Sequence, residues 1–209
     1  MTAWTAIVPV KAWRSAKSRL GVPGELRAEL AQALTLDTLD VLASHPSVGH
    51  VVVVTADPSV ADEARSRGLS VLAEEPATDP LNAAVRQGCS WVASRGDGPT
   101  VVVPADLAYL SAEVLETTLA SLAERGRAHV PDLAGTGTTL LAASRASDID
   151  PHYGVGSSAL HAAAGFPRLE RVDPRARTDV DELADLAHGP TWVPGLRVAA
   201  VMGRKSQSA

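Results

Sequence analysis

A cluster of cationic side chains directly follows the first apolar run of this sequence. Residues 5–10 (TAIVPV) predict a buried strand, and the nine residues 11–19 hold four cations, namely Lys11, Arg14, Lys17 and Arg19. In an open α/β sheet, ligands bind in the crevice beyond the carboxyl ends of the strands. Lysine and arginine side chains placed there bind phosphate groups. We therefore expect a phosphate-binding loop, the alternative being a solvated loop whose charges face water.

Three aspartates occupy positions from which they could bind a divalent metal. Asp106 directly follows a valine-rich strand predicted at 100–104, close to the end of the sheet where the cationic loop is expected. A carboxylate there could hold a metal ion that neutralises phosphate oxygens, or it could be an ordinary turn residue. Asp179 and Asp181 alternate along an extended segment and so share one face, which lets both point at one ion. Alternatively, Asp179 caps the helix predicted at 180–187.

Two segments rich in glycine and hydroxyl groups could bind an anion. Residues 135–139 (GTGTT) and 153–158 (YGVGSS) combine glycines, which let backbone amides approach a ligand closely, with hydroxyl donors. The second segment precedes a predicted helix, whose N-terminus favours phosphate or carboxylate. An ordinary hairpin turn and an ordinary loop are the alternatives. Asn82, which opens the helix predicted at 81–94, could contact the edge of a nucleotide base or could cap its helix.

These side chains need a framework that brings them together, and the rest of the sequence predicts a parallel sheet. Strands are expected at 5–10, 50–55, 70–73 and 100–104. Helices are expected at 25–42, 58–67, 81–94 and 111–124. Short strands at 128–131, 138–143 and 169–172 and the helix at 180–187 follow. The alternation predicts a three-layer α/β/α, Rossmann-like single domain over 1–209, with a mostly parallel sheet, a small added β element and a peripheral tail over 189–209.

Composition argues against several classes of protein. The 209 residues are 45% hydrophobic and 21% charged, which is typical of a globular domain. A net charge of −5 argues against a nucleic-acid partner or an anionic membrane surface. The single cysteine, Cys89, excludes an intrachain disulfide and is expected to be a small core residue. No stretch resembles a signal peptide or a membrane span, so we expect a cytoplasmic protein.

Several common catalytic motifs are absent. The sequence has no P-loop, no dinucleotide-binding glycine pattern after the first strand and no nucleophile elbow. The six histidines lack the helical pair spacing of a zinc site. These absences exclude a P-loop nucleotidase and disfavour a dehydrogenase.

The ordered set of motifs resembles one family, the 2-phospho-L-lactate/phosphoenolpyruvate guanylyltransferases of deazaflavin coenzyme F-420 biosynthesis, which have a nucleotidyltransferase fold. The segments that carry the resemblance run in order along residues 5 to about 187 and are VK at 10–11, AKSRL at 16–20, DPLN at 79–82, DL at 106–107, GTGT at 135–138, Gly154 with SS at 157–158, and DVD at 179–181. One departure is notable, because the family commonly has GDLP where this chain has ADLA at 105–108. The change could shift the metal position or the choice of acceptor.

The resemblance implies transfer of GMP from GTP to phosphoenolpyruvate, or to 2-phospho-L-lactate, with release of pyrophosphate. The Ala-, Arg- and Val-rich composition is typical of a high-GC bacterium. The resemblance implies that the bacterial branch of the family uses phosphoenolpyruvate, so we expect this acceptor and enolpyruvyl-diphospho-guanosine as the product. The implied roles are as follows: catalytic, Lys17 and Asp106; nucleotide-binding, Lys11, Lys17, Arg19 and Asn82; acceptor-binding, Thr138, Gly154 and Ser157; Mg²⁺-binding, Asp106, Asp179 and Asp181. A short-lived product would also favour association with the downstream deazaflavin transferase.

Three other functions stay open. One is a nucleotidyltransferase for another base or acceptor, such as a cytidylyltransferase. Another is a non-catalytic nucleotide-binding protein, against which the three aspartates argue. The third is an α/β interaction domain, for which GTP would not raise the melting temperature.

Overall fold

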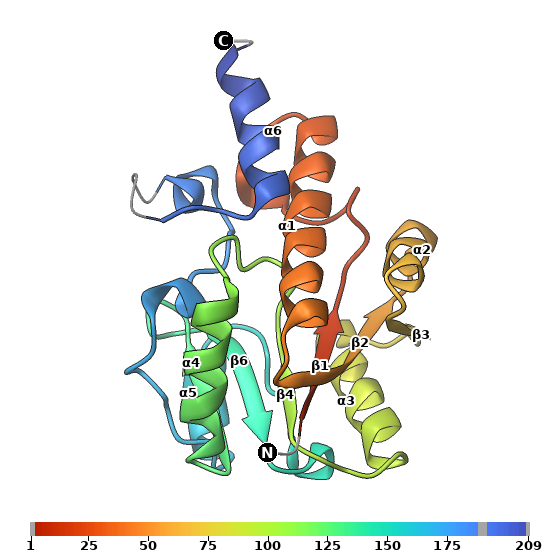
Figure 1. Ribbon diagram of the computed structural model, residues 1–209, viewed down its shortest axis with the longest axis vertical. Helices are drawn as coiled ribbons and strands as arrows, with labels where there is room; N and C mark the ends of the chain where they lie inside the picture. Colours follow the sequence, from red (N-terminus) through yellow and green to blue (C-terminus); the bar gives the residue numbers. More distant parts are fainter. Residues whose placement is uncertain (1–2, 188–191, 208–209) are drawn as a thin grey trace.

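A six-stranded sheet forms the centre of the structure, a computed structural model that describes residues 3–187 and 192–207 (Figure 1). The strands are β1 (Trp4–Pro9), β2 (Val48–Thr55), β3 (Ser70–Ala73), β4 (Thr100–Val102), β5 (Arg127–Pro131) and β6 (Thr138–Ala143), in the spatial order β3-β2-β1-β4-β6-β5. The first four strands pair in parallel, while β6 runs antiparallel to both β4 and β5. The mostly parallel sheet is therefore confirmed, and β5 and β6 extend this same sheet.

Helices cover both faces of the sheet and produce three layers (Figure 1). They are α1 (Gly24–Ser44), α2 (Pro58–Ser66), α3 (Pro80–Ala93), α4 (Ala112–Ala123), α5 (Ser157–Ala163) and α6 (Leu196–Gln207). Alternate residues of β1 point to opposite faces. Val8 belongs to the buried cluster that holds Leu39 of α1 and Leu115 of α4, whereas Ile7 belongs to the cluster with Val85 of α3. The predicted α/β/α architecture is confirmed.

Helix α3 approaches the sheet closely. Cys89 is buried there, as expected. A Cβ atom on the preceding residue, Gly88, would lie 2.6 Å from Cγ2 of Ile7, so only glycine fits at this contact. Burial raises the pKa of the Cys89 thiol to about 12, which keeps it protonated and unreactive.

Two elements expected near the C-terminus have a different form. Residues 169–172 do not form a strand, and only an isolated bridge joins Arg168 to His129. The helix expected at 180–187 is a short 3₁₀ turn over Leu183–Leu186. Its late start has a local cause, because the Asp185 carboxylate accepts hydrogen bonds from the backbone amides of residues 181 and 182, at 2.8 and 2.7 Å. The 179–182 segment therefore remains outside the turn.

The C-terminal segment is a packed helix where we expected a peripheral tail. Helix α6 lies against α1, with Val198 and Val201 buried (Figure 1). Its first turn is capped by Asp37 of α1, whose Oδ2 accepts from the backbone amides of Arg197 and Val198, both at 3.0 Å. A Cβ on Gly195 would collide with this carboxylate. Residues 188–191 and 208–209, also part of the expected tail, lie outside the described residues.

Replacing Asp37 with alanine is expected to detach α6 and to lower the free energy of unfolding by about 2–3 kcal/mol. The change removes the cap and leaves the Arg197 guanidinium, whose Nη1 lies 2.9 Å from Asp37 Oδ1, without one of its two carboxylates. Urea unfolding measures the loss. Asp62→Ala, which removes an exposed carboxylate from α2, is the control and should change stability little. Equal effects of the two changes would contradict the docking role.

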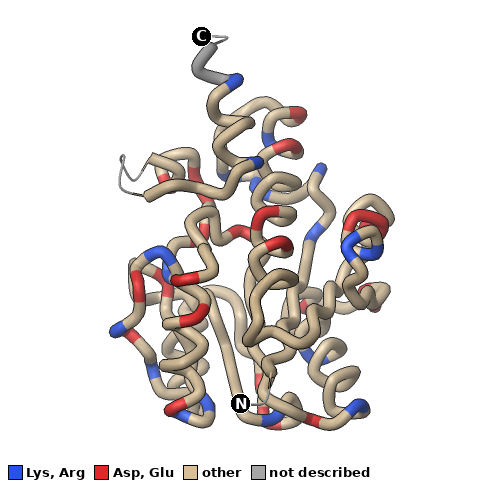
Figure 2. Tube along the Cα trace, in the orientation of Figure 1, with Lys and Arg blue, Asp and Glu red and all other residues tan. Residues whose placement is uncertain are grey.

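Charged residues are interspersed along the described chain, and Figure 2 shows no face of a single sign in this view. An anionic ligand must therefore be bound by local cations rather than by the field of the whole protein. Separately, no helix of the described chain is both long enough and apolar enough to cross a membrane.

Candidate active site

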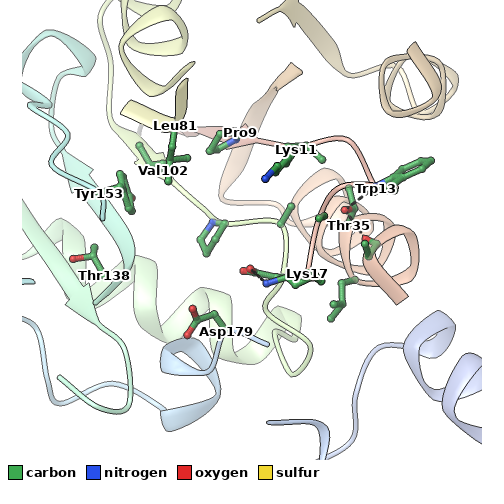
Figure 3. A pocket seen from close by; sticks show the side chains of 17 residues that line it. Pro9, Lys11, Trp13, Lys17, Thr35, Leu81, Val102, Thr138, Tyr153 and Asp179 are labelled. Carbon is green, nitrogen blue, oxygen red and sulfur yellow. Dashed lines mark hydrogen bonds and ion pairs between the residues drawn. The ribbon is translucent and has the colours of Figure 1, made fainter. Parts of the chain in front are cut away.

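A cavity of about 310 Å³ opens beyond the carboxyl ends of β1 and β4, where the sequence predicted the candidate site. Its polar side chains come from distant parts of the chain and are those of Lys11, Lys17, Thr35, Asp106, Thr138, Tyr153 and Asp179 (Figure 3). Parallel pairing of β1 with β4 brings the two following loops together, and antiparallel β6 begins at the same edge. In Figure 3, Lys11 points into the cavity across from Lys17 and Asp179.

Lys17 is the most constrained cation of the loop that follows β1. Its backbone adopts the left-handed conformation (φ 56°, ψ 41°), which is uncommon for a residue other than glycine. A 3₁₀ turn follows directly and is anchored by the buried side chain of Leu20. The ammonium forms an ion pair with Asp106 Oδ2 and lies 3.5 Å from Oδ1 of Asp181. Such a strained backbone held by its surroundings is typical of functional sites.

The Lys17 ammonium stays charged although it is largely buried. Burial alone lowers its pKa, but the negative charge of Asp106 and the hydrogen bond to it outweigh that effect, so the pKa is raised. Lys17 therefore supplies a fixed positive charge at the wall of the cavity, and phosphate oxygens are its natural ligands.

The two carboxyl groups of the cavity, those of Asp106 and Asp179, have one cation close to them in the described part of the chain, Lys17, which pairs with Asp106. Oδ1 of Asp106 is buried and has no hydrogen-bond partner among the described residues. Burial, and then the negative charge of Asp106, raises the pKa of Asp179 to about 7. A hydrogen bond from the Val180 amide to the Asp106 carbonyl, 3.1 Å long, holds the two segments together. An unpaired buried oxygen beside a carboxyl that resists ionisation fits a site for a cation.

Asp181, the third predicted metal ligand, is directed elsewhere. Its side chain is 53% exposed and pairs with Lys17 and with Arg19, whose Nη1 lies 3.6 Å from Asp181 Oδ2. Arg19 is itself exposed, and neither residue lines the cavity. Across residues 3–187 and 192–207, no three His, Cys, Asp or Glu side chains are arranged to hold one ion. Of the three predicted metal ligands, Asp106 and Asp179 are therefore the two that line the cavity.

The predicted acceptor residues are divided between the cavity wall and the layer behind it. Thr138 lines the cavity, and its Oγ1 lies 2.9 Å from Nδ1 of His161. Gly154 has a φ of 133°, a conformation that side chains rarely adopt, and forms a turn whose carbonyl accepts from the Ser157 amide. Ser157 is buried at the start of α5. Tyr153, which belongs to the segment singled out from the sequence but was given no role of its own, is the residue of this loop that reaches the cavity.

Asn82 supports the site from behind and does not line the cavity. Its Nδ2 donates to Asp79 Oδ2 at 2.8 Å and to the Tyr153 carbonyl at 2.9 Å, and its Oδ1 accepts from the Tyr153 amide at 2.7 Å. Both amide protons are thus occupied within the protein. The expected contact of Asn82 with guanosine is not what this geometry supports, since Asn82 holds Tyr153 in place while its neighbour Leu81 lines the cavity.

Sequence reasoning missed several other cavity residues. Trp13 donates from Nε1 to Oγ1 of Thr35 at 3.1 Å, so the two side chains form one wall. The alanines that depart from the family pattern play different parts. Ala105 lines the cavity, whereas Ala108 is buried and its carbonyl accepts from the Gly195 amide at 2.9 Å. The second change thus lies toward the C-terminal segment.

Acid pH is expected to destabilise the fold through His161. Burial, with smaller contributions from His129 and His152, lowers the pKa of this imidazole from 6.5 to about 4. A pKa that is lower in the folded chain contributes stability that is complete above pH 6.5 and is lost as the pH falls toward 4. The contribution is about 3 kcal/mol. Urea unfolding across this pH range should show a weaker pH dependence for His161→Asn, and equal dependence would contradict the assignment.

The chain is similar in sequence to known proteins over nearly its whole length. A family model described as "Guanylyl transferase CofC like" matches residues 4–164. A phosphoenolpyruvate guanylyltransferase of Salinispora arenicola is 40% identical over 211 residues, covering 99% of this chain and 96% of its own length. Another, from Streptomyces coelicolor, is 40% identical over 206 residues and covers 96% of each chain.

Comparison with solved structures shows the same fold at low sequence identity. A putative nucleotide-diphospho-sugar transferase from Desulfovibrio desulfuricans G20 has a TM-score of 0.74 at 16% identity, covering 99% of this chain and 96% of its own. A 4-diphosphocytidyl-2C-methyl-D-erythritol synthase has a TM-score of 0.62 at 14% identity, covering 89% of this chain and 96% of its own. The fold is that of nucleotidyltransferases.

Proposed function

Because the chain belongs to the CofC-like guanylyl transferase family, we propose that its cavity transfers GMP from GTP to phosphoenolpyruvate. The full-length relatives named phosphoenolpyruvate guanylyltransferase support this acceptor over 2-phospho-L-lactate. The reaction belongs to the biosynthesis of deazaflavin coenzyme F-420, and its product is enolpyruvyl-diphospho-guanosine.

One observation carries the proposal. A buried, charged Lys17 is paired with Asp106 in a cavity that Asp179 also lines, at the carboxyl ends of β1 and β4. This arrangement supplies positive charge together with carboxyl oxygens that are free to bind a metal ion, among them the unpartnered Oδ1 of Asp106. A transfer between two phosphate-bearing substrates needs both.

The reaction requires positioning and charge neutralisation more than proton transfer. A phosphate oxygen of phosphoenolpyruvate attacks the α-phosphorus of GTP, the bond from that phosphorus to the α–β bridging oxygen breaks, and pyrophosphate leaves. The attacking phosphate is already anionic, so no general base is needed. Lys17 neutralises charge on the triphosphate as it moves to the leaving group, and Lys11 lies across the cavity to assist.

Nucleotidyltransferases generally use a divalent metal ion, and we propose Mg²⁺ for this chain. Asp106 and Asp179 would hold it, together with phosphate oxygens of the substrates, because Mg²⁺ prefers oxygen ligands of this kind. When bound, the ion would neutralise the phosphates that must approach one another. Asp181 remains a supporting ligand in this proposal, since a phosphate bound to Lys17 would release the Asp181 carboxylate. Arg19, which pairs with Asp181, is proposed as a further cation for the phosphates of the nucleotide.

The acceptor is proposed to lie on the Thr138 side of the cavity. Thr138 contributes its hydroxyl, and the loop from Gly154 to Ser157 forms the adjoining wall through Tyr153. The nucleotide then lies toward Lys11 and Lys17, with Asn82 acting through the loop it holds.

Pyrophosphate release in the presence of Mg²⁺ tests the proposal. GTP, CTP and ATP are each combined with phosphoenolpyruvate, 2-phospho-L-lactate and 3-phosphoglycerate. Release is expected with GTP and phosphoenolpyruvate. A preference for CTP would instead identify a cytidylyltransferase, and a GTP-induced rise in melting temperature without release would identify a nucleotide-binding protein.

Association with a downstream enzyme is a further proposal, which follows from the product. A short-lived product would favour transfer to the downstream deazaflavin transferase by direct contact, and a pull-down with that enzyme tests this association. The cytoplasmic location predicted from the sequence remains a prediction.

A further inference from the structure

Two histidines lie buried directly behind Thr138 and take no part in the chemistry described above. His129 and His161 are both fully buried, and their ring centroids are 5.7 Å apart. Each ring nitrogen has a partner. His129 contacts the Phe166 carbonyl through Nδ1 at 2.8 Å and Ser158 Oγ through Nε2 at 2.9 Å. A buried histidine with both nitrogens engaged has a defined tautomer, which can be deduced from its partners.

The partners of His161 fix where its proton lies. The backbone amide of His152 donates to Nε2 of His161 at 2.9 Å, and a backbone amide can only donate. Nε2 is therefore the unprotonated nitrogen, and in the neutral ring the proton must lie on Nδ1. Nδ1 is the atom 2.9 Å from Oγ1 of Thr138, so the ring donates and the threonine oxygen accepts.

The direction of this hydrogen bond determines what Thr138 can offer a ligand. A hydroxyl that accepts through its oxygen still carries its own proton for a second partner. Thr138 lines the cavity, and among the residues that the structure describes this proton has no acceptor. The carboxylate and phosphate oxygens of a phosphorylated acid accept hydrogen bonds and cannot donate them when ionised. A Thr138 hydroxyl held as a donor is complementary to such a ligand.

We propose that His161 is a positioning residue for the acceptor, because it holds the Thr138 hydroxyl as a hydrogen-bond donor directed to an anionic oxygen of the bound phosphorylated acid. The same ring holds the start of the Tyr153 loop through the His152 amide, so it joins both sides of the acceptor wall. The inference rests on the proposed function for the identity of the acceptor. It does not rest on it for the direction of the hydrogen bond.

The surroundings of His161 favour the neutral ring that this role needs. His129 faces it from β5, and His152 and Asp150 face it from the loop before α5. Tyr153 packs edge-on against it with ring centroids 5.1 Å apart. Burial is the largest influence and lowers the pKa of His161, while Asp150 opposes it weakly.

Two substitutions of similar size separate the two hydrogen bonds of His161. Asparagine places an amide near the position of Nδ1, so His161→Asn keeps a donor for Thr138 and loses the acceptor for His152. Glutamine reaches the position of Nε2, so His161→Gln keeps the acceptor for His152 and loses the donor for Thr138.

We expect His161→Gln to raise the KM for the acceptor about tenfold, as Thr138→Val should, and to leave the KM for GTP unchanged. His161→Asn should raise the acceptor KM far less. Thr138→Ser keeps the hydroxyl and should raise the acceptor KM far less than Thr138→Val does.

A structural role alone would affect both His161 variants alike, and equal changes in the acceptor KM would overturn the proposal. The effects of His161→Gln and Thr138→Val should also fail to add in the double variant, since both remove one interaction. Full additivity would contradict the proposal.

The tautomer of the native protein gives a decision that needs neither activity nor a stable variant. Two-dimensional NMR of ¹⁵N-labelled histidine side chains distinguishes a protonated Nδ1 from a protonated Nε2. We expect His161 with its proton on Nδ1, and a proton on Nε2 would overturn the proposal even if both variants fail to fold. If no phosphorylated acid proves to be a substrate, the proposed function fails, whereas this measurement still decides how Thr138 is held.

Discussion

Asp106→Asn is expected to lower kcat/KM by about a thousandfold while the protein stays folded. Asparagine matches aspartate in shape but carries no charge, so it removes the negative charge that pairs with Lys17 and that would hold a cation at the unpartnered Oδ1. Loss of the negative charge also relieves the repulsion that contributes to the raised pKa of Asp179. The change also removes one ion-pair partner of Lys17, which keeps Asp181 at 3.5 Å, so the two effects on stability oppose each other and the protein without metal should stay folded. The measurement is steady-state pyrophosphate release, together with thermal unfolding.

The neighbouring strand provides a matched control for this substitution. Asp57 follows β2 much as Asp106 follows β4, but it caps α2 by accepting from the Ser59 amide and does not line the active-site cavity. Asparagine is an equally good helix cap, so Asp57→Asn should leave both activity and stability nearly unchanged. Near-native turnover by Asp106→Asn would show that the metal and the lysine are held by other groups.

Lys17→Met is expected to reduce kcat about a hundredfold or more, with little change in metal binding. Methionine keeps much of the length of the side chain and removes the ammonium that neutralises the phosphates. The neighbouring carboxylates lose a competing cation, so Mn²⁺, used as a probe for Mg²⁺, should bind as tightly as in the native protein or more tightly. Asp106→Asn should weaken Mn²⁺ binding, so the two variants fail for different reasons.

Arg14→Met is the control for the lysine substitution. Arg14 belongs to the same loop but is exposed and does not line the active-site cavity. Its replacement removes one positive charge from the loop, three residues before Lys17, and should leave kcat close to the native value. Comparable losses in the two variants would indicate that the overall charge of the loop matters, rather than the position of Lys17.

The strands of the sheet and the charged residues that follow them could be predicted because local sequence patterns determine them. Runs of valine mark strands that are buried on both faces of a parallel sheet, and Ile7 and Val8 of β1 indeed pack on opposite faces. Once the strands are known, Lys17 and Asp106 must meet, since each follows a strand and the two strands are neighbours. Asp179 was predicted from its alternation with Asp181 and from the resemblance to the family.

The remaining features depend on contacts between segments that are distant in the sequence. The sequence alone allows Asn82 to contact a base, and only the fold shows that its amide is hydrogen-bonded to Tyr153, 71 residues away. Helix α6 depends on a cap from Asp37, 160 residues earlier, so its own composition suggested only a tail. Burial of His161 behind Thr138 likewise follows from tertiary packing and leaves no signal in the spacing of the histidines.

The fate of the α-phosphate of GTP tests directly whether the protein transfers GMP to phosphoenolpyruvate. The protein is incubated with Mg²⁺, phosphoenolpyruvate and GTP labelled at the α-phosphorus, and the label is followed by chromatography while ³¹P NMR records the products. We expect the label to enter a compound in which it is joined through a diphosphate bridge to the phosphorus of phosphoenolpyruvate, with one pyrophosphate released for each such molecule. Label that remains in GTP, or that appears only as free GMP, would contradict it.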